Sequence, residues 1–147
     1  MNAIKTILKW VVGSIIVMQL ASFAFVKYPE SKATDPALEI KAPAEIMRVF
    51  KTSCYDCHSN ETKYPWYTKI APLSFGISRH VDLARKWVNF SEWENYSEKQ
   101  KDEKLGHIYK AVHTSMPLRN YVLLHPKADL TKEQRDMIRD WTDKAPF

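Results

Sequence analysis

The chain has 147 residues, of which 45% are hydrophobic and 12% aromatic, and its formal net charge is +5. This length allows one domain with a core of its own and a terminal extension. The charge is mild and no basic stripe with interleaved aromatic residues occurs, so the composition does not favour nucleic-acid binding. Three glycines accompany eight prolines, which predicts an all-α protein with proline-containing loops rather than a β-sandwich.

The first predicted element is an apolar helix near the N-terminus. Residues 10–26 contain no charged residue, and Lys5 and Lys9 come before them. With its apolar neighbours the stretch covers residues 7–26, close to the ~20 residues that cross the hydrocarbon core of a bilayer. Positive charge before a span favours a cytoplasmic N-terminus. We therefore predict a single-pass anchor in the inner (cytoplasmic) membrane, with the rest of the chain in the periplasm.

A cleaved signal peptide is the alternative interpretation of this segment. Ser22-Phe23-Ala24 is a fair small-x-small cleavage site, although the apolar stretch is long for a signal peptide. Either interpretation exports the remainder of the chain. We assign residues 1–27 to the anchor or signal segment. Residues 28–43 hold three prolines and mixed charge, a composition typical of a linker, and residues 44–147 are the predicted domain.

Both cysteines of the chain lie in the pentad CYDCH at residues 54–58. The C-x-x-C-H order is a signature for attachment of c-type haem. Two thiols one helical turn apart can each bond a vinyl group of one porphyrin, and the adjacent histidine can bind the iron. We therefore predict one haem c, covalently attached through Cys54 and Cys57, with His58 as an iron ligand.

Three other interpretations of the pentad have less support. A redox dithiol is expected in a thioredoxin-like βαβ context, and the sequence has no such strand pattern. A structural zinc site needs four Cys or His ligands, and no second C-x-x-C or paired-histidine cluster occurs. A structural disulfide would leave His58 without a role.

Two helices are predicted on either side of the pentad. The first begins near Pro43 and runs into the pentad, with an apolar face at helical spacing. The second covers residues 74–88, after a proline-punctuated loop at residues 59–73, and it is followed by a turn. The apolar positions of these two helices are Ile46, Val49 and Phe50, then Leu73, Ile77, Val81, Ala84 and Val88.

Two more helices are predicted from capping boxes, which are Ser97 with Gln100 and Thr131 with Gln134. Pro117 ends the first of them, because the residue before a proline is pushed out of the α region. The stretch between them, residues 118–130, is predicted to be a loop.

The second iron ligand is predicted to be Met116. A methionine on an apolar stripe usually belongs to the core, but Met116 comes just before Pro117, at a helix end where its sulfur could turn towards iron. His80 is the main rival, because it lies on the edge of an apolar stripe. The remaining candidates are His107, His113 and His125, and an open or water-bound position is a further alternative.

These motifs resemble known proteins. CYDCH, an apolar helix, the SMP sequence at residues 115–117 and a C-terminal helix with Trp141 resemble small monohaem class I cytochromes c. More closely, CHSNETKYPWYTKIAPLSF, VNFSEW, MPLRNYVLLHP and the closing DW resemble the bacterial haem-binding domain family with a single C-x-x-C-H, whose members are often membrane-anchored and exported. The resemblance covers about residues 44–142. It implies a small cytochrome c-like helical domain around the haem.

The resemblance also implies residue roles. These are His58 as the proximal iron ligand, Cys54 and Cys57 as the thioether sites, and Met116 as the distal ligand. Phe50, four residues before the first cysteine, is expected to cross the last helix at Trp141. A proline carbonyl is expected to orient the proximal histidine, and Pro72 fits in spacing, with Pro65 as the alternative.

Electron transfer is the function that these residues favour, since iron with histidine and methionine ligands can cycle between two oxidation states, and a thioether favours the ferrous state. The alternative is a haem sensor or a peroxidase-like enzyme with an open distal position, where His80, His113 or Arg119 could supply polar groups. A thiol or zinc module without haem is the third hypothesis. The sequence has no Ser-His-Asp order, P-loop or dinucleotide glycine pattern, and it does not identify a redox partner protein.

Overall fold

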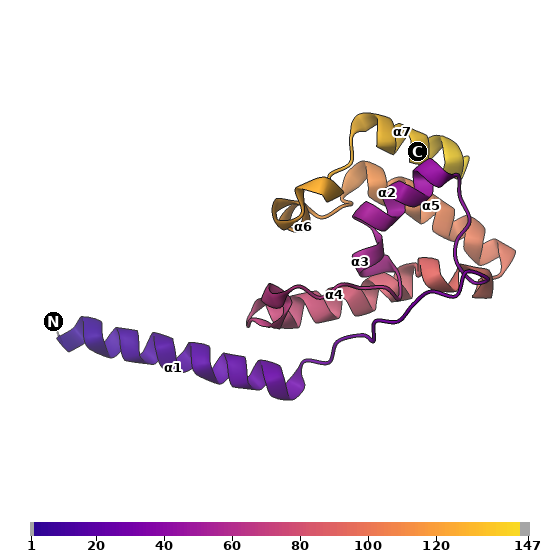
Figure 1. Cartoon of the computed structure of the whole chain (residues 1–147). Coiled ribbons are helices and arrows are strands. Elements are labelled where there is room, and N and C mark those ends of the chain that lie inside the picture. The colour runs from indigo at the N-terminus through magenta and orange to yellow at the C-terminus, as the bar shows by residue number, and fades with distance from the viewer. Residues whose placement is uncertain (1, 145–147) are drawn as a thin grey trace.

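The computed structural model describes residues 2–144 and contains only helices and connecting segments in that range (Figure 1). The predicted all-α class is therefore confirmed. The helices, with short 3-10 turns labelled η, are α1 (Asn2–Phe25), α2 (Ala44–Ser53), α3 (Tyr55–His58), η1 (Trp66–Lys69), α4 (Leu73–Trp87), η2 (Phe90–Asn95), α5 (Glu98–Thr114), α6 (Arg119–Leu124), η3 (Pro126–Ala128) and α7 (Lys132–Thr142).

Helix α1 extends away from the remaining helices, which pack together (Figure 1). Its 24 residues give it a length of about 36 Å at the usual helical rise, and its apolar side chains are exposed along most of that length. It is long and apolar enough to cross a membrane, as a signal sequence near the N-terminus would also be.

The elements with strong local signals occur where the sequence predicts them. Helix α4 covers the predicted 74–88 within one residue at each end. Both capping boxes are present, with the side chains of Ser97 and Thr131 accepting from the backbone of Gln100 and Gln134 at the beginnings of α5 and α7. These helices begin where a hydroxyl satisfies a backbone N–H that the helix itself cannot pair.

The prediction that residues 118–130 form a loop is wrong, because α6 and η3 lie there. Helix α6 has only six residues and none of them is buried, so no apolar periodicity marks it in the sequence. 3-10 turns also occur in two segments that were expected to be a loop and a turn, namely η1 in residues 59–73 and η2 after Val88.

The core centres on Phe50, which is fully buried. Its ring stacks on Phe90 at a centroid distance of 4.8 Å and meets the edge of Trp141 at 5.6 Å. The contact with Trp141 joins α2 to α7, so the crossing implied by the cytochrome c resemblance is confirmed. Burial of such aromatic side chains is the largest apolar contribution a small helical domain can make.

Residues 28–43 form no helix but follow the surface of the domain. The hydroxyl of Tyr28 donates to the carbonyl of Thr68 (2.6 Å). The amide of Lys32 donates to the carbonyl of Asn60 (2.8 Å), and the amide of Ile40 donates to the carbonyl of Phe90 (2.9 Å). Ile40 is itself part of the buried core. We call residues 28–43 the strap, because they connect α1 to the domain while remaining bonded to it.

Candidate functional site

The CYDCH pentad forms the corner between α2 and α3. Helix α2 ends at Ser53, and Cys54 leaves the helical conformation with φ of −124°. Its carbonyl then accepts from the amides of Cys57 (3.1 Å) and His58 (2.9 Å), which closes the single turn of α3. This local turn holds the two sulfurs and the imidazole close together on one short element.

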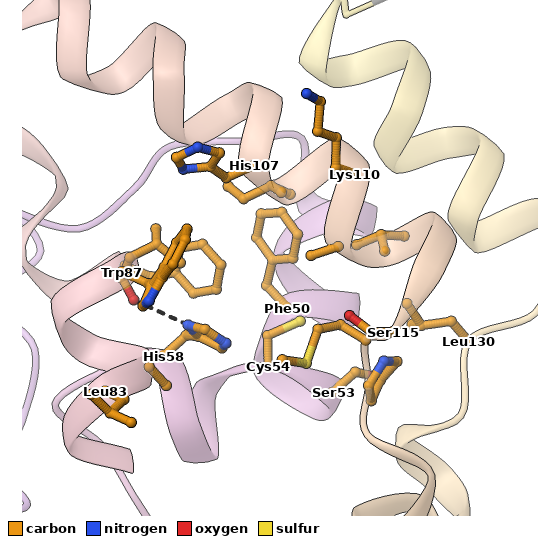
Figure 2. Close-up of a pocket in the computed structure, with 18 of the residues that line it drawn as sticks. Phe50, Ser53, Cys54, His58, Leu83, Trp87, His107, Lys110, Ser115 and Leu130 are labelled. Atoms are coloured by element: carbon orange, nitrogen blue, oxygen red, sulfur yellow. Dashed lines mark hydrogen bonds between the residues drawn. The ribbon is translucent and has the colours of Figure 1, made fainter. Parts of the chain in front are cut away.

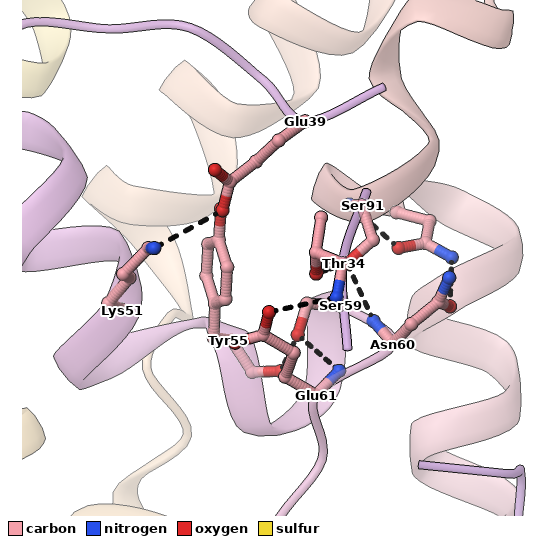
Figure 3. A network of polar contacts seen from close by, with 9 residues as sticks. Thr34, Glu39, Lys51, Tyr55, Ser59, Asn60, Glu61 and Ser91 are labelled. Atoms are coloured by element: carbon pink, nitrogen blue, oxygen red, sulfur yellow. Dashed lines mark hydrogen bonds and ion pairs between the residues drawn. The ribbon is translucent and has the colours of Figure 1, made fainter. Parts of the chain in front are cut away.

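A polar network holds α3 in place (Figure 3). Tyr55 is buried, and its hydroxyl donates to the carboxylate of Glu39 (2.8 Å), which also lies 3.3 Å from the ammonium of Lys51. After α3, the amide of Asn60 donates to the hydroxyl of Ser91 (2.9 Å). These bonds tie both sides of the pentad to the strap, α2 and η2.

Further bonds complete this network around the strap. The Thr34 hydroxyl lies 2.6 Å from that of Ser91, and the Thr34 amide donates to Glu61 (3.1 Å). Sequence reasoning missed the network, since its members come from four separate segments and no motif links them.

The imidazole of His58 is oriented by a backbone carbonyl. Its Nδ1 donates to the carbonyl oxygen of Val88 (3.1 Å; dashed in Figure 2), so the resemblance-based assignment of this role to Pro72 or Pro65 is wrong. Val88 caps the C-terminal end of α4, where carbonyls have no partner within the helix and are free to accept. With Nδ1 engaged, Nε2 keeps its lone pair for a metal.

His58 is held in its neutral form. Burial lowers the pKa of its imidazole, the bonds to the carbonyls of Val88 and Ala84 oppose that effect, and nearby His80 lowers it further. The net pKa is below the ordinary histidine value. An unprotonated imidazole is the form that binds iron.

A pocket of about 690 Å³ opens beside the pentad, between α2, α4 and α5 (Figure 2). Cys54, His58 and Met116 all line it, so the structure brings three of the four predicted site residues together. The rest of its lining is mostly apolar, and it includes Phe50, Leu83, Ala84, Trp87, Val88, Phe90, Ile108, Ala111, Val112 and Leu130.

The fourth predicted residue, Cys57, lines a neighbouring pocket of about 470 Å³ between α3, η1, α4 and α6. His80 lines both pockets. Of the aromatic residues near the pentad in sequence, Tyr64 and Tyr67 line this second pocket, as does Tyr121 from α6, whose hydroxyl donates to Asp56 (2.8 Å).

Three histidines, His107, His113 and His125, are placed less favourably as iron ligands than His58 and Met116. His125 lies 3.0 Å from the hydroxyl of Tyr67 through its Nε2 and is stacked on Tyr121. His113 is exposed, and its Nδ1 lies 2.9 Å from the carbonyl of Tyr109. His107 is exposed at the edge of the first pocket, against the ring of Trp87.

Neither cysteine is in a disulfide, and both thiols are protonated at neutral pH. Burial raises the pKa of Cys54 to about 12, and the neighbouring Cys57 raises it further. Burial, with the charge of Asp56, raises the pKa of Cys57 to about 11, although Arg85 opposes this. Redox dithiols and metal-binding cysteines need the opposite shift, towards thiolate. In the part of the chain that the structure describes, no three His, Cys, Asp or Glu side chains are grouped to hold a metal ion.

The haem-binding domain family matches residues 13–144, which is most of the chain. The chain belongs to this family. No curated protein and no solved structure matches it. As a haem-binding domain it carries the C-x-x-C-H pentad beside two adjoining pockets, the larger of which has a mostly apolar lining.

The residues of this haem-binding domain fit the group. Cys54 and Cys57, both free, line two pockets that share His80, so both thiols adjoin open space. The neutral imidazole of His58, with Nε2 unengaged, and the thioether of Met116, on the segment that follows α5, both line the larger pocket and could hold the iron.

Proposed function

We propose that this haem-binding domain is an exported monohaem c-type cytochrome that transfers electrons. Cys54 and Cys57 carry the haem through thioether bonds, and His58 and Met116 are the two iron ligands. The observation that supports this best is the shared pocket: an imidazole fixed through Nδ1 and a methionine line the same apolar cavity as the first cysteine.

In this proposal the Val88 carbonyl, the apolar pocket lining and the methionine ligand each have a task. The Val88 carbonyl fixes the tautomer and the ring orientation of His58, as outer partners of metal-bound histidines do. The apolar lining excludes water, which is one of the protein's means of setting a haem potential. Bound haem supplies a one-electron redox couple, and a methionine ligand raises its potential.

Electron transfer accounts for this lining better than catalysis does. A catalyst or gas sensor needs an open position on the iron with polar groups above it. The lining of the larger pocket is mostly apolar, and besides His58 its titratable side chains are His80, His107 and Lys110. Of these, His107 and Lys110 are exposed, so only His80 could act as a partly buried acid or base there.

A second candidate follows from the position of His80, which lines both pockets and lies close enough to His58 to lower its pKa. If His80 rather than Met116 approached the iron, the methionine would be free. The domain would then be a bis-histidine carrier or a sensor with a displaceable ligand. The experiment below separates the two.

We further propose that α1 anchors the domain to the inner membrane from the periplasmic side. Support comes from its length and apolar surface and from the lysines that precede its uncharged stretch. The mass of the mature protein decides between an anchor and a cleaved signal peptide.

The test uses the full chain produced in cells that mature c-type cytochromes. A haem stain should persist on a denaturing gel and disappear in Cys54→Ala/Cys57→Ala. The ferric spectrum should contain the red-edge band of a thioether–iron bond. Met116→Ala should remove that band, whereas His80→Ala should keep it. The matched control is Met47→Ala, because Met47 packs on the core outside both pockets. Colourless protein with two free thiols, or a band that survives Met116→Ala, would contradict the proposal.

A further inference from the structure

The C-terminal part of α1 is fixed against the domain by side-chain hydrogen bonds. The amide of Gln19 donates to the carbonyl of Lys69 (3.0 Å), and its oxygen accepts from the amide of Ala71 (3.0 Å). One turn further on, the hydroxyl of Ser22 donates to that of Ser74 (2.7 Å), and both serines are buried. The helix therefore has a defined height relative to η1 and the beginning of α4.

That height lies within the apolar segment. The uncharged stretch ends at residue 26, seven residues after Gln19. These seven residues correspond to about 10 Å along the helix axis. Leu20 and Phe23 lie at the same level and are exposed, at 62% and 71%. If α1 crosses a bilayer, the parts of the domain that touch Gln19 reach the depth of these apolar side chains.

The domain exposes apolar side chains at this same end. We call them the rim: Trp66, Ile70, Leu73, Leu123 and Leu124. Trp66 is 75% exposed and Leu123 is 74% exposed. Leu73 and Leu124 line the same pocket, and the bond from Tyr67 to His125 joins η1 to the end of α6, so the two halves of the rim are neighbours. In Figure 1, three elements lie on the side of the domain that faces the N-terminal end of α1: η1, the first turn of α4, and α6.

We infer that the rim inserts at the boundary between the headgroups and the acyl chains of the same bilayer that α1 crosses, to a depth of about 10 Å. This inference depends on the proposed anchor. Tryptophan is enriched at that depth, because its ring is apolar while its N–H reaches water, and Lys69, exposed within the rim, can pair with lipid phosphates. Exposing five large apolar side chains to water would otherwise cost free energy with no compensation.

The orientation that follows places the domain on the membrane rather than at the end of a free tether. Helix α4 runs from the rim towards the opposite end of the domain, where α5 begins (Figure 1). Lys99 lies in the first turn of α5 and is exposed. It is therefore a surface position that should remain in water.

The test measures the depth of spin labels in the full, haem-loaded chain, reconstituted into nanodiscs of phosphatidylcholine and phosphatidylglycerol. Single cysteines replace Trp66, Leu123, Lys99 or Gly13, the last on an open face of α1. The native cysteines are consumed by haem attachment, so unmodified protein is the blank for labelling. Collision with oxygen reports lipid, and collision with a water-soluble nickel chelate reports water.

The expected result is a label at Gly13→Cys deep in lipid, a label at Lys99→Cys fully in water, and labels at Trp66→Cys and Leu123→Cys at least three-fold less accessible to nickel than the label at Lys99→Cys. Rim labels as accessible as the Lys99→Cys label, with Gly13→Cys in lipid, would overturn the inference and leave the anchor intact. A water-exposed label at Gly13→Cys would overturn the anchor and the inference together. Spin–spin broadening between rim labels would show that a second copy covers the rim, and would also overturn it.

Discussion

Cys54 and Cys57 are neutral thiols that are largely shielded from water. Burial removes water that would stabilise a thiolate, and this is the main reason that both pKa values rise. A protonated, poorly hydrated thiol is a weak nucleophile and a weak metal ligand. The pair is therefore expected to react slowly with oxidants and metal ions in the haem-free chain.

This leads to a prediction about the haem-free protein. Produced where haem cannot be attached, the folded chain should react with iodoacetamide at pH 8 at least ten-fold more slowly than a free cysteine, because only the thiolate is the nucleophile. The rate should rise steadily with pH up to about 11, the pKa of Cys57. Mass spectrometry of each cysteine-containing peptide measures it, and a denatured sample is the control. Reaction at the free-cysteine rate in the folded chain would contradict the raised pKa values.

The C-x-x-C-H pentad could be found from the sequence, but the contacts that hold it could not. The order C-x-x-C-H identifies three residues because the chemistry requires them to be adjacent, so the motif is local. The partner of His58 could not be found this way, since it is a backbone carbonyl from Val88 and any residue type could supply it. A weak signal existed: Val88 ends a predicted helix, and helix ends have free carbonyls.

At the scale of the elements, helices with strong caps were predictable and the short ones were not. A capping box needs only a hydroxyl and a glutamine three residues apart, so α5 and α7 could be placed from sequence. Helix α6 is held by its neighbours through Tyr121 and His125. Such contacts between distant segments produce no periodic apolar pattern in the sequence.

The capping boxes give the second prediction. Ser97→Ala and Thr131→Ala should each lower the free energy of unfolding by about 1 kcal/mol, because each leaves an N-terminal amide of its helix unpaired. The midpoint of urea unfolding measures this. Lys99→Ala, on the exposed first turn of α5, is the matched control and should change the midpoint little. Equal losses in Lys99→Ala would assign the effect to side-chain length rather than to capping.

The crossing of α2 and α7 gives the third prediction. The edge-to-face contact of Phe50 with Trp141 should appear as a coupling of about 0.5–1.5 kcal/mol in a double-mutant cycle of Phe50→Leu and Trp141→Leu. The paired control is Trp141→Leu with Trp66→Leu, since Trp66 is on the exposed rim, and these two should be additive within about 0.5 kcal/mol. Additivity in both cycles would mean that the two rings pack independently.

On the scale of the whole molecule, the strap shows where composition misleads. Its prolines and mixed charge resemble a flexible linker, yet Ile40 belongs to the core and Thr34 is bonded to Glu61 and Ser91. One buried side chain in a polar stretch cannot be distinguished from an exposed one without the surface it meets. The helical class and the order of the main helices were predictable, because they depend on patterns within each segment.

Haem bound in the two pockets beside the pentad, as proposed, would become part of the core, and this leads to the last prediction. A ligand that occupies apolar space in the folded state and has no such site in the unfolded chain stabilises the fold by its binding free energy. For a domain of this size, a few kcal/mol correspond to a rise in Tm of about 10–20 °C. The haem-loaded chain should therefore melt that much higher than the haem-free chain in the same detergent, followed by circular dichroism at the helical minimum. Cys54→Ser/Cys57→Ser, produced with and without the maturation apparatus, is the control and should melt at one temperature. Equal melting of the loaded and haem-free chains would mean that α2, α4 and α5 close over the pocket unaided.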